Sequence, residues 1–378
     1  HGACLSGSGR VGRADDRSSV GGTLRVEALG LEPAEVALAK ALGPDLRGGF
    51  RFHWREGSST LDLTGIDIAG DGLAARGALK LAGLETGLIT TGTMQVEAAD
   101  LSRFSALADR PLGGSATISV EGSAGVLSGT VDAVAEVEAN GLTVDIDEVD
   151  NLLRGPSTVR ISVLRDETGT SLRGLDLTAG VLTAQASGRL STSGSSLAAE
   201  VSLTDLSALG GAYGGSATLA ASFAGTAQDG RLAIDGSARN LRVGTAAADR
   251  ILAGTSTLSA RLGLRDGKIE VDRASLSNPQ ATLSVSGRLE GAVRQLSIDA
   301  RLANLGLILP EIQGPLSLTG SARQDTAGYT VDVGYSGPAG INGNVRGTVA
   351  QSLSRADLAL AGVGRATLTN LFISPRAL

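Results

Sequence analysis

The stretch DLSRFSALADRPLGGSATISVEG (residues 100–122) decides the fold of this chain, because a related stretch, DLSALGGAYGGSATLAASFA, follows at residues 205–224. Each copy begins with Asp-Leu-Ser, which is typical of a helix N-cap, and continues through a short helical segment. Gly-Gly then ends the helix, and small polar residues alternate with aliphatic ones. We therefore expect a short helix followed by strands, repeated along the chain.

The same period-two alternation recurs over nearly the whole sequence, bounded by Gly, Ser, Asn or Asp turn residues. Such a pattern is typical of strands with one apolar and one wet face, and it predicts on the order of 20–25 strands. The apolar positions are the candidate binding residues. They are Leu61, Leu63, Ile66, Ile68, Ile118, Val120, Val201, Leu203, Leu219, Ile269, Val271, Leu283, Val285, Leu296 and Ile298.

Two weaker copies extend the repeat. One begins at Asn304-Leu305-Gly306, and one at Ala28-Leu29-Gly30, so repeat units are expected to start near 28, 100, 205 and 304. Short helices are predicted near residues 33–42, 101–108 and 206–211. Residues 1–20, rich in Gly, Ser and Arg, are predicted to be a disordered or foreign end, and residues 21–378 a single repetitive β-rich region.

Composition favours an all-β, elongated sheet over compact domains. Gly supplies 54 of 378 residues and aromatic residues only 2%, while 42% are hydrophobic, nearly all of them aliphatic. We predict a curved, solenoid-like gutter, a β-taco, with an apolar concave face. The net charge of −6 and the absence of a basic stripe with stacking aromatics argue against nucleic-acid binding. Position 1 is His and no apolar run could cross a membrane, which we interpret as a piece of a longer protein.

The sequence offers no constellation for catalysis. Gly7–Gly12 spells a dinucleotide fingerprint but lacks the strand before it and the helix after it. His1 and His53 are the only histidines and Cys4 the only cysteine, so no zinc site or nucleophile–base pair is expected. We predict that the protein is not an enzyme and needs no cofactor or metal.

An acidic cluster and the single tryptophan are considered as possible functional sites. The acidic residues Asp145, Asp147, Glu148 and Asp150 lack the residues that an EF-hand loop requires at its fifth and sixth positions, and a solvated strand end before a short helix at 149–154 is favoured. Trp54 is interpreted as a strand residue near one strand end.

In its tandem groups of alternating strands, each opened by a short helix, and in its aliphatic, Gly-rich composition, the chain resembles the AsmA-like family. Within that family it resembles the TamB proteins, the inner-membrane component of the translocation and assembly module. The stretches that carry the resemblance are residues 100–122, 205–224, 240–258 and 272–279. The resemblance covers about residues 21–378 and implies the middle portion of such a protein.

The resemblance implies a location and partners. The family spans the periplasm of Gram-negative bacteria from an inner-membrane anchor, here in a segment absent from the chain. It engages an outer-membrane barrel of the Omp85 type (TamA-like) through regions that also lie outside. Its implied roles are passage of phospholipid to the outer membrane and assembly or secretion of outer-membrane proteins.

The residues themselves favour a matching mechanism. An aliphatic face without fixed polar groups recognises hydrocarbon, such as phospholipid acyl chains, or an unfolded β-strand in transit, rather than one ligand pose. The alternative is a β-helix or solenoid adhesin, or an autotransporter passenger domain, whose apolar face is closed core.

Overall fold

The computed structural model of the chain is nearly all β-structure, with 69% strand and 10% helix in an open antiparallel sheet. It describes residues 2–14, 17–30, 36–83, 87–226, 228–266, 268–290, 293–324, 328–350, 355–360 and 364–369. The predicted fold class, an all-β, elongated and repetitive curved sheet with short helices, is confirmed.

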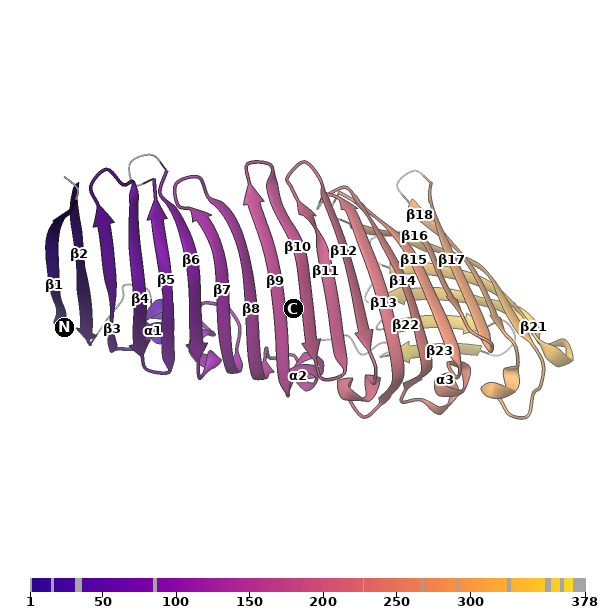
Figure 1. Ribbon diagram of the computed structural model, residues 1–378. Coiled ribbons are helices and arrows are strands. Elements are labelled where there is room, and N and C mark those ends of the chain that lie inside the picture. The colour runs from indigo at the N-terminus through magenta and orange to yellow at the C-terminus, as the bar shows by residue number, and fades with distance from the viewer. Residues whose placement is uncertain are drawn as a thin grey trace. The chain divides into compact units, whose positions relative to one another are not determined.

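The chain forms two compact units, and in the first the strands pair in chain order, β1 with β2, β2 with β3, and so on to β11. Every one of these ladders is antiparallel, so this unit is a meander (Figure 1). Its strands are β1 Gly2–Ala14, β2 Arg17–Leu29, β3 Leu46–Arg55, β4 Thr60–Gly70, β5 Leu73–Ala82, β6 Ile89–Ala98, β7 Gly113–Gly125, β8 Thr130–Thr143, β9 Pro156–Asp166, β10 Gly169–Ala179 and β11 Leu182–Leu190.

The second unit repeats this plan with an antiparallel meander from β13 to β23. β12, Ser195–Leu203, carries the chain from one unit to the next. The remaining strands are β13 Tyr213–Gly225, β14 Gly230–Val243, β15 Thr255–Arg265, β16 Lys268–Ser277, β17 Ala281–Glu290, β18 Val293–Leu302, β19 Leu316–Gln324, β20 Gly328–Ser336, β21 Asn342–Ala350, β22 Arg355–Leu360 and β23 Gly364–Thr369.

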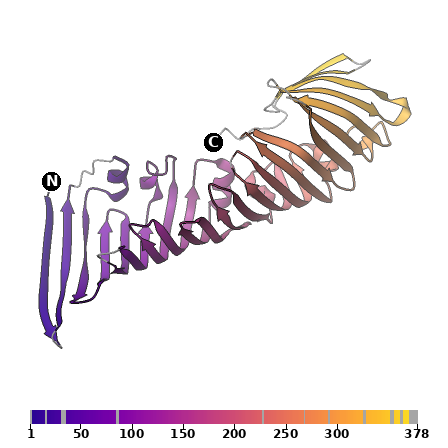
Figure 2. The same cartoon turned by 90° about the horizontal axis from the view of Figure 1, so that it is seen from above.

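All helices described in the chain follow even-numbered strands. In a meander, successive turns alternate between the two ends of the strands, so within each unit the helices gather at one edge of the sheet. Figure 2 shows α1, η1 and α2 on one side of the first unit. The helices are α1 Val36–Leu42, η1 Leu101–Phe104, α2 Asp147–Leu153, η2 Leu206–Leu209, α3 Ala246–Ile251, η3 Leu305–Leu307 and η4 Pro338–Gly340.

The strand order explains the long repeat. The segments η1, η2 and η3 follow β6, β12 and β18, and α2, α3 and η4 follow β8, β14 and β20, so both series recur every six strands. The copy predicted near residue 28 follows β2 and contains α1, which by strand count belongs with α2 and α3. That copy was therefore matched to the wrong series, because a short helix beside Gly occurs in both.

The structure also corrects the prediction for residues 1–20. Gly2–Ala14 and Arg17–Leu29 form a hairpin in continuous antiparallel register, and β2 pairs onward with β3. Glycines such as Gly7 and Gly9 lower the strand propensity of this segment. The backbone ladder to β2 nevertheless supplies the hydrogen bonds that an isolated segment would lack. The Gly7–Gly12 fingerprint thus lies inside a strand.

The three predicted helices coincide with α1, η1 and η2, and the helix predicted at 149–154 with α2, while α3 and η4 were missed. Residues 33–35 of the first prediction lie outside the described residues. Trp54 lies in β3 next to its last residue, as predicted, and its Nε1 donates to Ser58 O at 3.1 Å.

Candidate functional site: an open apolar face

One face of the first unit is apolar across adjacent strands. Strand register places Val96 opposite Ile118, Ile118 opposite Val137, and Val137 opposite Val159, and directly opposed residues share a face. All four side chains are half-buried, because neighbours along the row cover one another. We call this side of the sheet the apolar face.

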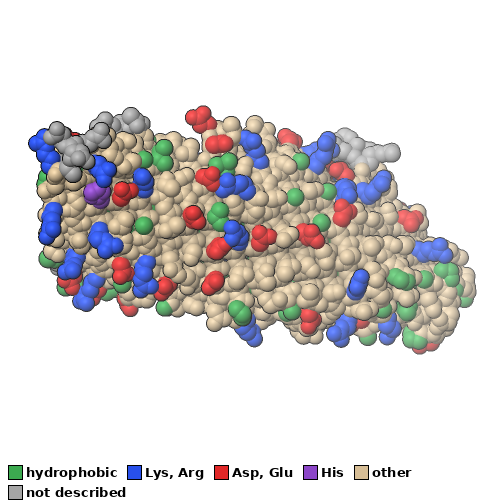
Figure 3. All heavy atoms as spheres, viewed as in Figure 1, with side chains coloured by type: hydrophobic (Ala, Val, Ile, Leu, Met, Phe, Trp, Pro, Cys, Tyr) green, Lys and Arg blue, Asp and Glu red, His purple; other side chains and the backbone are tan. Residues whose placement is uncertain are grey.

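The opposite side, the polar face, carries charge. Arg76 lies 3.4 Å from Asp67 and 3.2 Å from Glu97, and Arg160 pairs with Glu136. Figure 3 shows acidic and basic side chains spread over this face. The sheet of the first unit therefore has one solvated, charged side and one aliphatic side.

The helices cover only one margin of the apolar face. The row nearest the helical edge is buried and contains Ala98, Ala116, Ala139, Ser157 and Ala179. Small side chains are needed there because α2 and η1 contact β8 and β7 directly. The rows farther from the helices stay half-buried or exposed, so the apolar surface remains accessible beside a helical margin.

The second unit has an apolar face of its own. One row runs through Leu219, Gly236, Leu258, Leu276 and Leu283 on β13–β17. Leu219, Leu258 and Leu283 remain 41%, 38% and 39% exposed, values that a covered core would not leave. Gly236 and the half-buried Leu276 lie between these exposed leucines, and the row is therefore a candidate binding surface.

The candidate residues fall on these apolar faces wherever strand pairing defines a face. In the first unit Leu61, Leu63, Ile66 and Ile68 oppose Leu81, Leu79, Gly77 and Ala75 of β5, and Met94 opposes Val120. Ile66 and Leu296 are buried, so these two are covered positions.

In the second unit Val285 opposes Ile298 and Val271 opposes Leu262. Val201 and Leu203 flank Ser202, whose hydroxyl lies 3.4 Å from that of Thr218, a polar-face residue. The side chain of Ile269 lies outside the described part of the chain.

A buried arginine interrupts the apolar face of the second unit, and sequence reasoning missed it. Arg294, only 5% exposed, opposes Leu289 but reaches back to β16, where its Nη1 lies 2.8 Å from Glu270 Oε2 and its Nη2 2.9 Å from Asp272 Oδ1. Its Nε donates to Val271 O at 3.1 Å. Gly287 makes room for it, because a Cβ there would lie 2.7 Å from Arg294 Nη2. The one signal in the sequence was a charged residue at an apolar position of the alternation.

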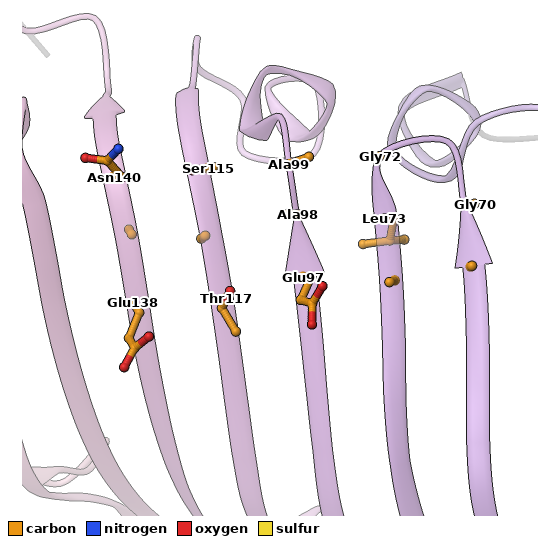
Figure 4. Close-up of a pocket in the computed structure, with 14 residues that line it drawn as sticks. Gly70, Gly72, Leu73, Glu97, Ala98, Ala99, Ser115, Thr117, Glu138 and Asn140 are labelled. Atoms are coloured by element: carbon orange, nitrogen blue, oxygen red, sulfur yellow. The ribbon is translucent and has the colours of Figure 1, made fainter.

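The strand ends of the first unit line a cavity of about 600 Å³ (Figure 4). Glu97, Thr117 and Glu138, opposed on β6, β7 and β8, line it together with Ala and Gly residues at the strand ends. The Glu97 carboxylate already pairs with Arg76, and the cavity is open to solvent. Within the described ranges, no group of three or more His, Cys, Asp or Glu side chains could hold a metal ion.

The acidic residues at 145–150 have structural positions. Asp147 begins α2, and Asp150 Oδ1 accepts a hydrogen bond of 2.7 Å from Val144 N. This carboxylate holds the chain at the turn between β8 and the helix.

Comparison of the chain with protein-family models, curated proteins and solved structures finds no match. No helix in the described ranges has the length and apolar character needed to cross a membrane.

Proposed function

We propose that the apolar face binds hydrocarbon, namely the acyl chains of phospholipids. The bound chains contact the sheet on one side and solvent on the other. The observation that carries the proposal is the exposed row Leu219, Leu258 and Leu283 on a face made of adjacent, register-matched aliphatic positions. Burying such side chains against acyl chains gains roughly 25 cal/mol per Å² of apolar area.

The large exposed surface is consistent with this role. The chain exposes 22,707 Å², whereas a compact protein of 37.9 kDa exposes about 14,000 Å². A single layer of sheet leaves its second face uncovered, and an uncovered aliphatic face is stabilised when a ligand covers it.

Backbone pairing favours acyl chains over an unfolded polypeptide. Interior strands such as β7 and β17 use their N–H and C=O groups in ladders on both sides. A polypeptide lying on the apolar face would find side chains but no backbone partners, and each of its unsatisfied polar groups would cost free energy. A hydrocarbon chain has no such groups.

The cellular setting of the proposal comes from the family resemblance. A TamB-like protein would carry phospholipid across the periplasm toward the outer membrane, or assist protein assembly there, with an inner-membrane anchor and an Omp85-type partner outside these residues. The competing adhesin hypothesis assumed a β-helix or a closed core. The observed sheet is antiparallel and not closed, which argues against a β-helix. A covered apolar core is the result of the melting experiment below that would favour this alternative.

The test uses Val285→Asp with Ser284→Asp as its matched control. Val285 is half-buried on the apolar face between Ala274 and Ile298, and Ser284 is its exposed neighbour on the polar face. A charge in hydrocarbon costs roughly 2.5–3.5 kcal/mol, enough for about a hundredfold loss of acyl-chain occupancy at that segment.

We expect both variants to melt like the wild type, because either carboxylate can reach water. Crosslinks to a photoreactive phospholipid should be lost in Val285→Asp alone. Collapsed melting of Val285→Asp indicates a covered core and contradicts the proposal, as do crosslinks that persist in it.

A further inference from the structure

A cavity of about 680 Å³ lies at the helical margin of the first unit, beside the contact between α1 and η1. Three cations line it, Lys40 from α1, Arg103 from η1, and Arg110 from the loop that follows. The hydroxyls of Ser102 and Ser105 and the carboxylate of Asp109 complete the polar lining.

Arg103 is fixed in place. Its Nη1 lies 3.3 Å from Asp71 Oδ2 and its Nε donates to Lys40 O at 3.4 Å. Gly43, at φ +77°, permits this approach, because a Cβ there would lie 2.6 Å from Arg103 Nη2. The guanidinium therefore ties η1 to α1 across the intervening strands, and its side chain is only 16% exposed.

Lys40 and Arg110 are held differently. Both are exposed, and neither forms an ion pair within the described ranges. The loop that carries Arg110 is ordered by its own hydrogen bonds, from Arg110 N to Ser105 O at 3.2 Å and from Leu112 N to Ser105 Oγ at 2.9 Å. The cavity thus presents two available cations on a fixed frame.

This basic lining runs against the charge of the chain. The protein has a net charge of −6, yet three cations and one carboxylate line this cavity. The corresponding segments after β12 and β18, residues 205–215 and 304–314, contain no Lys or Arg. The repeat therefore does not account for Arg103 and Arg110, whereas Lys40 has a basic counterpart in Arg250, in the last turn of α3.

We propose that this cavity binds the phosphate of an anionic lipid headgroup, with Lys40 and Arg110 as its principal contacts. Arg and Lys are the side chains that best match phosphate, Arg through paired N–H groups and Lys as a point charge. The inference rests on the proposed function, because a lipid with its chains on the apolar face would bring its headgroup to the margin where the helices end that face.

The experiment compares the Lys40→Ala/Arg110→Ala double variant with an Arg154→Ala/Arg165→Ala control. The control removes two positive charges from the same unit outside the cavity. Binding is measured by co-sedimentation with phosphatidylcholine vesicles containing phosphatidic acid. Each basic residue near an anionic lipid surface contributes about fivefold, so the double variant should bind about thirtyfold more weakly while the control binds nearly as the wild type.

Two further arms separate the sources of phosphate and the two proposals. Vesicles with diacylglycerol in place of phosphatidic acid should not distinguish the variants, and excess inorganic phosphate should displace the protein only weakly. Equal losses in variant and control overturn the inference, and strong displacement by inorganic phosphate assigns the cavity to a soluble phosphate and overturns the lipid headgroup. If the headgroup inference fails, acyl crosslinks on the apolar face that persist in the double variant still support the proposed function. If the wild type itself forms no acyl crosslinks, both the proposed function and the headgroup inference are overturned.

Discussion

The connection through α2 in the first unit and the connection through α3 in the second are the same structure built from different sequences. Gly114 and Gly215 form matching bulges at φ +96° and +94°. Asp150 Oδ1 accepts from Val144 N, and Asp249 Oδ1 from Val243 N, both at 2.7 Å. The two glycines lie 101 residues apart and the Val and Asp positions 99, so the repeat is defined by its turn and hydrogen-bonding residues more than by its aliphatic ones.

The two connections differ in how a buried serine is satisfied. Ser256, 3% exposed, lies 3.2 Å from Asn278 Nδ2, which also donates to Ile251 O at 2.9 Å. Ser157, 2% exposed, occupies the matching position, but Ala179 stands where Asn278 would be and the Ser157 hydroxyl has no partner. One copy is tied by an amide bridge, and the other relies on close packing of small residues.

The largest effect should come from the shared bulge. A Cβ at Gly114 would lie 2.5 Å from Gly141 O, and at Gly215 it would collide with Arg239 O, both of them backbone atoms. Gly114→Val and Gly215→Val should each destabilise their own unit by about 3 kcal/mol or more, from strain plus steric overlap. Hydrogen exchange of β7–β8 and of β13–β14 measures this. Gly174→Ala, at an open position, is the control, and a mild effect in either unit would break the equivalence.

The second largest effect should come from the side-chain amide bridge of Asn278. Asn278→Ala removes its donations to Ile251 O and Ser256 Oγ, and the acceptor for Gln280 N and Ala281 N. We expect a loss of about 2 kcal/mol, because buried partners are left unsatisfied. Exchange should rise at the β14–β15 and β16–β17 connections. The exposed Asn342→Ala should leave both unchanged, and a neutral Asn278→Ala would show that the bridge adds nothing to packing.

The sequence predicted the strands and their faces because alternation is a local property that each strand carries by itself. Val285 and Ile118 could be assigned to the apolar side from their immediate neighbours. Helix α3 was missed because Thr245-Ala246-Ala247 lacks both the Asp-Leu-Ser start and a Gly-Gly end. The match between Val144–Asp150 and Val243–Asp249 was the available signal for it.

The candidate cavity and the buried charge could not be predicted in this way, because both depend on contacts between distant strands. Arg294 is buried only where β18 approaches β16 past Gly287. The position of Arg103 depends on Lys40 O, 63 residues earlier in the chain. Nothing in the neighbouring residues reports such approaches.

A smaller effect should separate the two serines. Ser256→Ala should cost about 1 kcal/mol, because it leaves an Asn278 donor without one of its partners. Ser157→Ala should be neutral or slightly stabilising, since it removes a buried hydroxyl that has no partner. Thermal unfolding read by unit-specific hydrogen exchange distinguishes the two. Equal losses at both sites would mean that the Ser157 hydroxyl is satisfied in solution.

The smallest effect concerns acid and a second set of repeated turns. Asp100 and Asp205 each accept a 2.9 Å hydrogen bond from the backbone N–H two residues on, and Asn304 does the same at 3.0 Å. Hydrogen bonds from the side chain and backbone of Ser102 and Ser207 lower the pKa of the two aspartates below the usual value. Asn304 cannot titrate, so it serves as the internal control.

The lowered pKa of the two aspartates determines how the stability of these turns changes with pH. A carboxyl group that is more acidic in the folded protein favours folding above its unfolded pKa, and this contribution is lost as the pH falls through the folded pKa. Below about pH 4, where an unfolded Asp begins to protonate, the Ser102 and Ser207 amides should therefore exchange faster relative to Gly306. Both carboxylates are exposed, so only a local loosening is expected. Asp100→Asn and Asp205→Asn should abolish the acid response and make all three turns behave like the one at Asn304. A response that survives these substitutions would place the acid-sensitive group elsewhere in the sheet.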